Sequence, residues 1–193
     1  MTRNGFRRSR DRSGRLLRHS AISVCLIAAL SLELPCSSLA ADEPSEYQVK
    51  AVFVLNFTKF VEWPATAFAA ADSPISICIF GDDPFGSALD QIVAGEVVNG
   101  RRVATQRIKH PPQPKSCQLL FIGRSEKDIP KILPSLGPGV LTIGEGEGFI
   151  RDGGMIAFVL ENRRVRFEIN QAGAESAGIK LSSRLLNVAK SVE

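Results

Sequence analysis

The chain has 193 residues, and its 24 lysines and arginines against 20 aspartates and glutamates give a formal net charge of +4 at pH 7. Seven of the basic and two of the acidic residues lie in residues 1–40, which leaves 17 basic and 18 acidic residues in residues 41–193. The positive charge therefore belongs to the N-terminal segment, and composition gives no support to nucleic-acid binding by the rest of the chain. Residues 41–193 are enough for one domain with an ordinary hydrophobic core.

Residues 1–40 have the layout of a secretory signal peptide. Seven arginines precede an apolar run over residues 21–32, and the segment ends in the small residues Ser38-Leu-Ala40. We expect cleavage after Ala40, export to the periplasm and a folded domain over residues 41–193. Two alternatives are an uncleaved N-terminal anchor in the inner membrane and a lipoprotein modified at Cys36, whose flanking glutamate and proline are unfavourable for that modification.

The chain has four cysteines, and two of them, Cys25 and Cys36, lie in the signal segment. The remaining pair, Cys78 and Cys117, predicts one disulfide, because exported proteins with an even number of cysteines commonly oxidise them. Two buried thiols in adjacent strands are the alternative.

A helix is expected immediately after the signal segment. Ser45 and Gln48 have the spacing of a capping box, and no glycine or proline follows until Pro64, which should end the helix after Trp63. Apolar residues cover almost all of its surface, so it must be buried by its own domain or by a partner. Its polar strip supplies the candidate partner contacts, which are Lys50, Thr58 and Glu62.

Strands and helices alternate through the first half of the remaining chain. Apolar or alternating runs predict strands over residues 75–80, 101–108, 117–122 and 140–143. Between them, Asp83 should cap a helix reaching Val93, and Ser125 should cap a short helix through Leu133.

The second half closes with a hairpin. Five glycines in residues 144–154 predict tight turns, and the strands at 155–160 and 165–169 read as an antiparallel pair around a turn at 161–163. Asn170 should cap a short helix, and Ser182 or Ser183 should start the last one. The fold class is α/β, a single layered domain with a mixed β-sheet flanked by helices, a closing β-hairpin and one disulfide.

Residues 41–193 hold little catalytic chemistry. Their one histidine, His110, lies in a proline-rich connector, and they contain no nucleotide-binding loop, hydrolase motif or metal-spaced cluster. The Ser182-Ser183 pair near Lys180 fits helix capping better than catalysis, and Asp82 and Asp83 fit a helix start. We therefore expect that the protein is not an enzyme and that it binds no metal ion and no cofactor.

Ten segments, in order along nearly all of residues 47–186, together resemble the YfiR family, which carries the domain label DUF4154. The most recognisable is Asn-Phe-Thr-Lys-Phe-Val-Glu-Trp-Pro at residues 56–64. The others are residues 47–53, 77–81, 83–86, 117–122, 141–144, 148–149, 153–156, 165–170 and 181–186. Leu55 departs from the tyrosine that members commonly carry before the Asn-Phe pair.

The resemblance implies a periplasmic repressor. Members of this family bind the periplasmic sensor region of an inner-membrane diguanylate cyclase of the YfiN type and hold it inactive, which lowers cyclic di-GMP and biofilm formation. It also implies that Cys78 and Cys117 form the family disulfide, and that a homodimer can form.

The alternative function is a periplasmic small-molecule sensor acting on another membrane protein, such as a histidine kinase. Its ligand would occupy a cleft lined by the turns at residues 81–86 and 144–154, which follow two of the expected strands.

Overall fold

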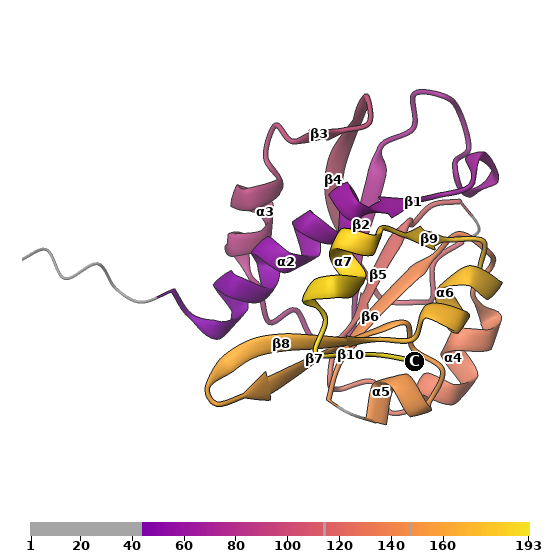
Figure 1. Ribbon diagram of the computed structural model, residues 1–193. Helices are drawn as coiled ribbons and strands as arrows, with labels where there is room; N and C mark the ends of the chain where they lie inside the picture. The colour runs from indigo at the N-terminus through magenta and orange to yellow at the C-terminus, as the bar shows by residue number, and fades with distance from the viewer. Residues whose placement is uncertain (1–43, 114, 147) are drawn as a thin grey trace, which may run out of the picture. The chain divides into compact units, whose positions relative to one another are not determined.

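The computed structural model describes residues 44–113, 115–146 and 148–193, so the expected signal peptide lies outside the described residues (Figure 1). Within these ranges the chain forms an eight-stranded sheet in the order β10-β8-β7-β6-β5-β2-β4-β3. Its strands are β2 (Ile75–Phe80), β3 (Val97–Val98), β4 (Arg101–Ile108), β5 (Leu119–Ile122), β6 (Leu141–Glu145), β7 (Ile156–Glu161), β8 (Arg164–Ile169) and β10 (Ser191–Val192).

The sheet is mixed, as expected. Strands β4, β2, β5, β6 and β7 are parallel neighbours, whereas β8 runs antiparallel to β7 and completes the closing hairpin. Strand β2 lies between β4 and β5, so the chain first builds outward to β4 and then crosses back to β5. In doubly wound sheets ligands bind at such a reversal of strand order.

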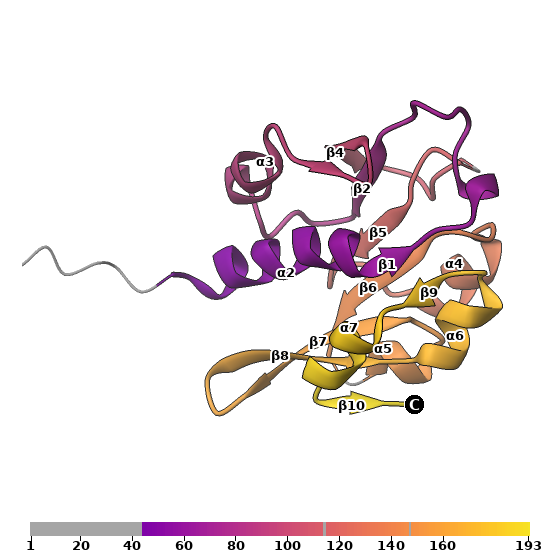
Figure 2. The same ribbon diagram turned by 45° about the horizontal axis from the view of Figure 1, so that its top comes forward.

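Helices cover both faces of the sheet (Figures 1 and 2). Helices α2 (Glu46–Phe60), α3 (Ser87–Val93) and α7 (Ser183–Val188) pack on one face, and α4 (Ile129–Ser135) and α5 (Gly148–Arg151) pack on the other. Helix α6 (Gln171–Ser176) adds Ala174 to the core on the α2 face.

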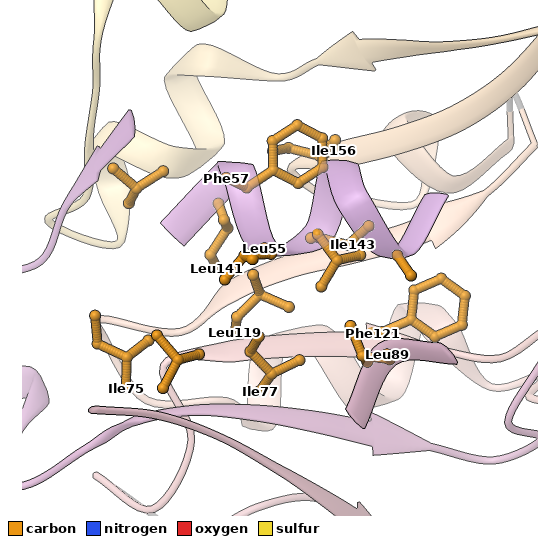
Figure 3. Packing of buried hydrophobic residues seen from close by; sticks show 14 of the residues in the cluster. Leu55, Phe57, Ile75, Ile77, Leu89, Leu119, Phe121, Leu141, Ile143 and Ile156 are labelled. Atoms are coloured by element: carbon orange, nitrogen blue, oxygen red, sulfur yellow. The ribbon is translucent and has the colours of Figure 1, made fainter. Parts of the chain in front are cut away.

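The alternation of side chains along the central strands divides the core into two clusters. Ile75, Ile77 and Ile79 of β2 point toward α2, whereas Cys78 and Phe80 point toward α4 and α5. Figure 3 shows the cluster under α2, where side chains from the helix and from four parallel strands interlock. Because both faces of these strands are buried, their sequences are continuous apolar runs, and these runs are what predicted the strands.

Helix α2 starts with the predicted capping box but ends earlier than expected. Ser45 accepts a hydrogen bond from the Gln48 N–H, and the Gln48 side chain accepts one from the Ser45 N–H. The helix ends at Phe60 rather than Trp63, because the next two residues form β1 (Val61–Glu62), which pairs with β9 (Lys180–Leu181).

Of the other predicted helix caps, two are wrong and two are confirmed. Asp83 accepts from the N–H groups of Phe85 and Gly86, so it closes a turn, and α3 begins later at Ser87. Ser125 accepts from the Asp82 N–H instead of capping α4, which starts at Ile129. The confirmed caps are Asn170 on α6 and Ser182 on α7.

The predicted disulfide is present. Cys78 in β2 and Cys117, just before β5, are joined across neighbouring strands and are both buried. The bridge closes a loop that contains α3, β3 and β4.

No helix in the three described ranges is long and apolar enough to span a membrane.

Candidate functional site

The carboxyl ends of β2 and β5, where an α/β sheet of this topology would hold a ligand, are closed by their own loops. The Gly123 N–H donates to the Phe80 carbonyl (2.8 Å), and the Asp82 N–H donates to Ser125 Oγ (3.2 Å). A Cβ on Gly123 would lie only 2.5 Å from the Asp82 carbonyl oxygen, so glycine is needed for this approach. The loops that follow β2 and β5 therefore contact each other directly at this edge.

A hollow of about 200 Å³ lies beside this closed edge, but only one of the two expected turns lines it. Residues from 144–154 contribute to its wall together with residues from 122–129, and residues 81–86 do not. Three carboxylates and one guanidinium line it, which are Glu126, Glu145, Asp152 and Arg124. It is smaller than the 300–1,000 Å³ usual for small-molecule sites.

The reactive-looking residues of the sequence have structural roles. Ser182 caps α7, and Asp83 is held in a turn by an ion pair with Arg107 (2.9 Å). Arg107 also pairs with Asp90 at 2.6 Å, and this hydrogen bond, with a second one from Thr105, holds the pKa of the Asp90 carboxyl below its usual value of 3.8. The described residues contain no cluster of three or more potential metal ligands.

The candidate partner contacts do not form one exposed strip. Lys50 is buried, and its ammonium pairs with Glu46 and with Glu145. Thr58 is also buried, and its hydroxyl donates to the Leu55 carbonyl oxygen (2.6 Å) inside α2. Only Glu62, on β1, is exposed, so it alone keeps the role of a predicted partner contact.

Lys50 is the centre of a charged cluster that the sequence did not reveal. Glu145, at the end of β6, also accepts from Arg124 Nε at 2.5 Å and from the Tyr47 hydroxyl at 3.4 Å. The Lys50 ammonium lies 4.6 Å from the centroid of the Tyr47 ring, a distance typical of a cation–π contact. This cluster fixes the first turns of α2 to the sheet.

The opposite side of α2 carries an uncovered apolar stripe. Val49, Val52, Phe53 and Asn56 have the i, i+3, i+4, i+7 spacing of one helix face. Val52 is 45% exposed, and Val49 and Phe53 are half-buried. The sequence predicted a helix apolar almost all round, and the structure shows that the domain covers only part of it.

Hollows flank this stripe on both sides. One, of about 490 Å³, lies between α2 and α3 and has no charged residue in its wall. The other, of about 550 Å³, lies between the start of α2 and the β7–β8 hairpin. Both are lined by Pro44, Val49 and Phe53, so they form a single surface that we call the α2 groove.

The hairpin side of the α2 groove combines apolar and basic groups. Leu160, which is 54% exposed, faces the groove together with Val165, its partner across the hairpin. Arg163 and Arg164 stand at the tip. An exposed apolar surface of this kind marks a site of protein or ligand contact.

Sequence reasoning missed this groove because its parts come from separate elements. The sequence indicated a partner only through the apolar residues that cover almost all of α2, and this pattern does not show which face of the helix stays exposed.

One comparison with known proteins assigns the chain to a family. No curated protein matches the chain. A solved structure from Vibrio cholerae, described as a conserved domain protein, is similar over 78% of this chain at 11% identity and a TM-score of 0.48. This chain spans 61% of that protein's length. The family model described as YfiR/HmsC-like, DUF4154, matches residues 47–190, which include the whole sheet except its last strand, and the chain therefore belongs to the YfiR/HmsC-like family.

Proposed function

We propose that this protein is a non-enzymatic periplasmic regulator that binds the periplasmic sensor region of an inner-membrane diguanylate cyclase of the YfiN type. Binding holds the cyclase inactive and lowers cyclic di-GMP and biofilm formation. The family match over residues 47–190 is the observation that carries the proposal. Export follows from the signal-like layout of residues 1–40.

The architecture is compatible with a binding role. The edge of the sheet that would hold a substrate is closed by loop contacts, whereas the α2 groove leaves apolar side chains exposed. A regulator that works by association needs such a surface and needs no catalytic group.

Gene deletion with complementation tests the function. Deletion should raise cellular cyclic di-GMP, and expression of the exported protein should restore the lower level. A version lacking residues 1–40, which stays in the cytoplasm, is the control for compartment. Unchanged cyclic di-GMP in both the deletion and the overexpressing strain would refute the proposal.

A second candidate function is a small-molecule sensor that acts on another membrane protein, such as a histidine kinase. The hollow between α2 and α3, at about 490 Å³, has the volume of a small-ligand site and a mostly apolar wall. Thermal-shift measurements with amino acids and other small metabolites would detect such a ligand, and a flat response across the panel argues against it. The implied homodimer is a separate proposal, which sedimentation of the mature protein would test.

A further inference from the structure

The α2 groove has the chemistry of a helix-binding surface. Its floor is the α2 stripe, whose side chains repeat at the spacing of one helix face. Helix α3 forms one wall beside this floor. A third helix bound between α2 and α3 would pack the ridges of its side chains into the grooves between theirs. Apolar anchors at i, i+3, i+4 and i+7 are how amphipathic helices fill grooves of this kind.

The charge of the groove is positive and confined to one end. The wall between α2 and α3 is uncharged, whereas Arg163 and Arg164 stand at the hairpin end. Neither arginine forms an ion pair within the described ranges, and Glu161, which lies opposite Arg164 in the hairpin, does not approach it closely enough for one. Glu46, the acidic residue of this wall, is engaged in an ion pair with Lys50.

Arg163 occupies a backbone position that suits glycine better. Asn162 and Arg163 both have positive φ angles, 50° and 63°, as in a type I′ hairpin turn, where the second position favours glycine. An arginine there costs stability that a glycine would not. Backbone strain kept at an exposed, charged position suggests a functional use of the side chain.

If cleavage occurs after Ala40 as expected, too few N-terminal residues remain to cover this surface. Pro44 lines both hollows, and cleavage after Ala40 would leave only Ala41, Asp42 and Glu43 ahead of it. Three residues cannot fill hollows of about 490 and 550 Å³ on the two sides of the stripe.

We propose that the α2 groove binds an amphipathic helix of the regulated membrane protein. The apolar face of that helix packs on α2, and its acidic residues contact Arg163 and Arg164. This inference rests on the proposed function and names the surface and the partner chemistry that serve it. Apolar burial on Val52 and Leu160 supplies affinity, and the two arginines fix the direction of the bound helix.

Four variants in the deletion strain test the proposal. Val52→Asp places a charge in the stripe, and Arg163→Gly removes a positive charge while relieving the turn. Val97→Asp is the control for the first, because Val97 is 59% exposed and lines neither hollow. Lys115→Gly is the control for the second, because Lys115 is also an exposed cation with a positive φ, 64°, away from the groove.

The test variants should lose repression and the controls should keep it. We expect Val52→Asp and Arg163→Gly to raise the amount of protein needed for half-maximal lowering of cyclic di-GMP by about tenfold. Arg163→Gly should also melt at an equal or higher temperature than the wild type, so its loss cannot come from unfolding. If Val52→Asp fails to fold, Leu160→Asp takes its place. Repression at the wild-type level by the folded test variants would overturn the proposal.

Photo-crosslinking separates this proposal from the proposed function. A benzoylphenylalanine at position 52 should crosslink to a helix-forming, acidic segment of a membrane protein, and one at position 97 should not. Crosslinks to a second copy, to residues 1–43 of the same chain, or to no protein would overturn the inference. If deletion leaves cyclic di-GMP unchanged while the position-52 crosslink reaches such a helix, the groove assignment stands and the cyclase assignment fails.

Discussion

Lys50 and Glu145 form an ion pair inside the protein, although 95 positions separate them in the chain. Their side chains are only 1% and 2% exposed, and the pair joins the first turns of α2 to the end of β6. Glu46 and Arg124, which are more exposed, extend the cluster and add one negative and one positive charge, so the four charges balance.

Removing one member of this pair should destabilise the fold strongly. Lys50→Met removes the buried cation beside Glu145 and leaves it with Arg124, whose side chain is 64% exposed, so we expect a loss of about 3 kcal/mol in the free energy of unfolding. Lys50→Met with Glu145→Leu should lose less, because the buried carboxylate is then removed as well. Urea unfolding measures both variants. A single variant within about 0.5 kcal/mol of the wild type would contradict this ranking.

The disulfide should contribute strongly to stability. The sequence separation of 39 between Cys78 and Cys117 corresponds to about 4 kcal/mol in the chain-entropy account. Cys78→Ala with Cys117→Ala should therefore unfold at much lower urea than the oxidised wild type, and reduced wild type should behave similarly. Equal midpoints, with both thiols open to alkylation in the oxidised protein, would show that no bridge forms in solution.

Gly144, near the end of β6, should not tolerate even alanine, because it packs on Phe149. A Cβ on Gly144 would lie 2.3 Å from this ring, so Gly144→Ala should cost about 1–3 kcal/mol through overpacking. Gly137→Ala is the matched control, because nothing lies within 4 Å of its Cβ position and its φ angle is not positive. Thermal unfolding of the two variants should separate them clearly, and similar melting temperatures would argue against this packing.

The Asp90 carboxyl should make stability depend on pH in the acid range. The hydrogen bond from Arg107 lowers the pKa of Asp90 below 3.8, so the ionised form favours the folded state. Its contribution is fully present above about pH 4 and is lost as the pH falls through the lowered pKa. The stability difference between wild type and Asp90→Asn should therefore be larger at pH 7 than at pH 2.

Asp128→Asn is the control for this measurement, because Asp128 pairs with Lys131 at an exposed position. Its stability difference should be small at both pH values. A difference for Asp90→Asn that does not shrink on acidification would contradict the assigned role of the Arg107 hydrogen bond.

Local signals predicted much of this fold. The capping box at Ser45 and the caps at Asn170 and Ser182 need only neighbouring residues, so the sequence contains all the information for them. The buried strands followed from their continuous apolar runs.

Long-range pairing explains what the sequence did not predict. Helix α2 stops at Phe60 because β9, more than 100 residues later, pairs with the next two residues. Asp83 does not cap α3, because its carboxylate accepts from the N–H groups of Phe85 and Gly86 in the preceding turn and pairs with Arg107 of β4. Lys50 was predicted to lie on an exposed strip, but it is buried because Glu145 from β6 supplies the opposite charge in the interior.

The two walls of the α2 groove are tethered differently. Helix α3 lies inside the loop that the Cys78–Cys117 bond closes, so a covalent link limits how far this wall can move from the sheet. The β7–β8 hairpin lies outside that loop, and non-covalent contacts hold it: its ladder of hydrogen bonds and the packing of Val165 on the core. For a helix bound in the groove, α3 would therefore be the more rigid wall and would set its position, whereas the hairpin could move to fit helices with larger or smaller side chains.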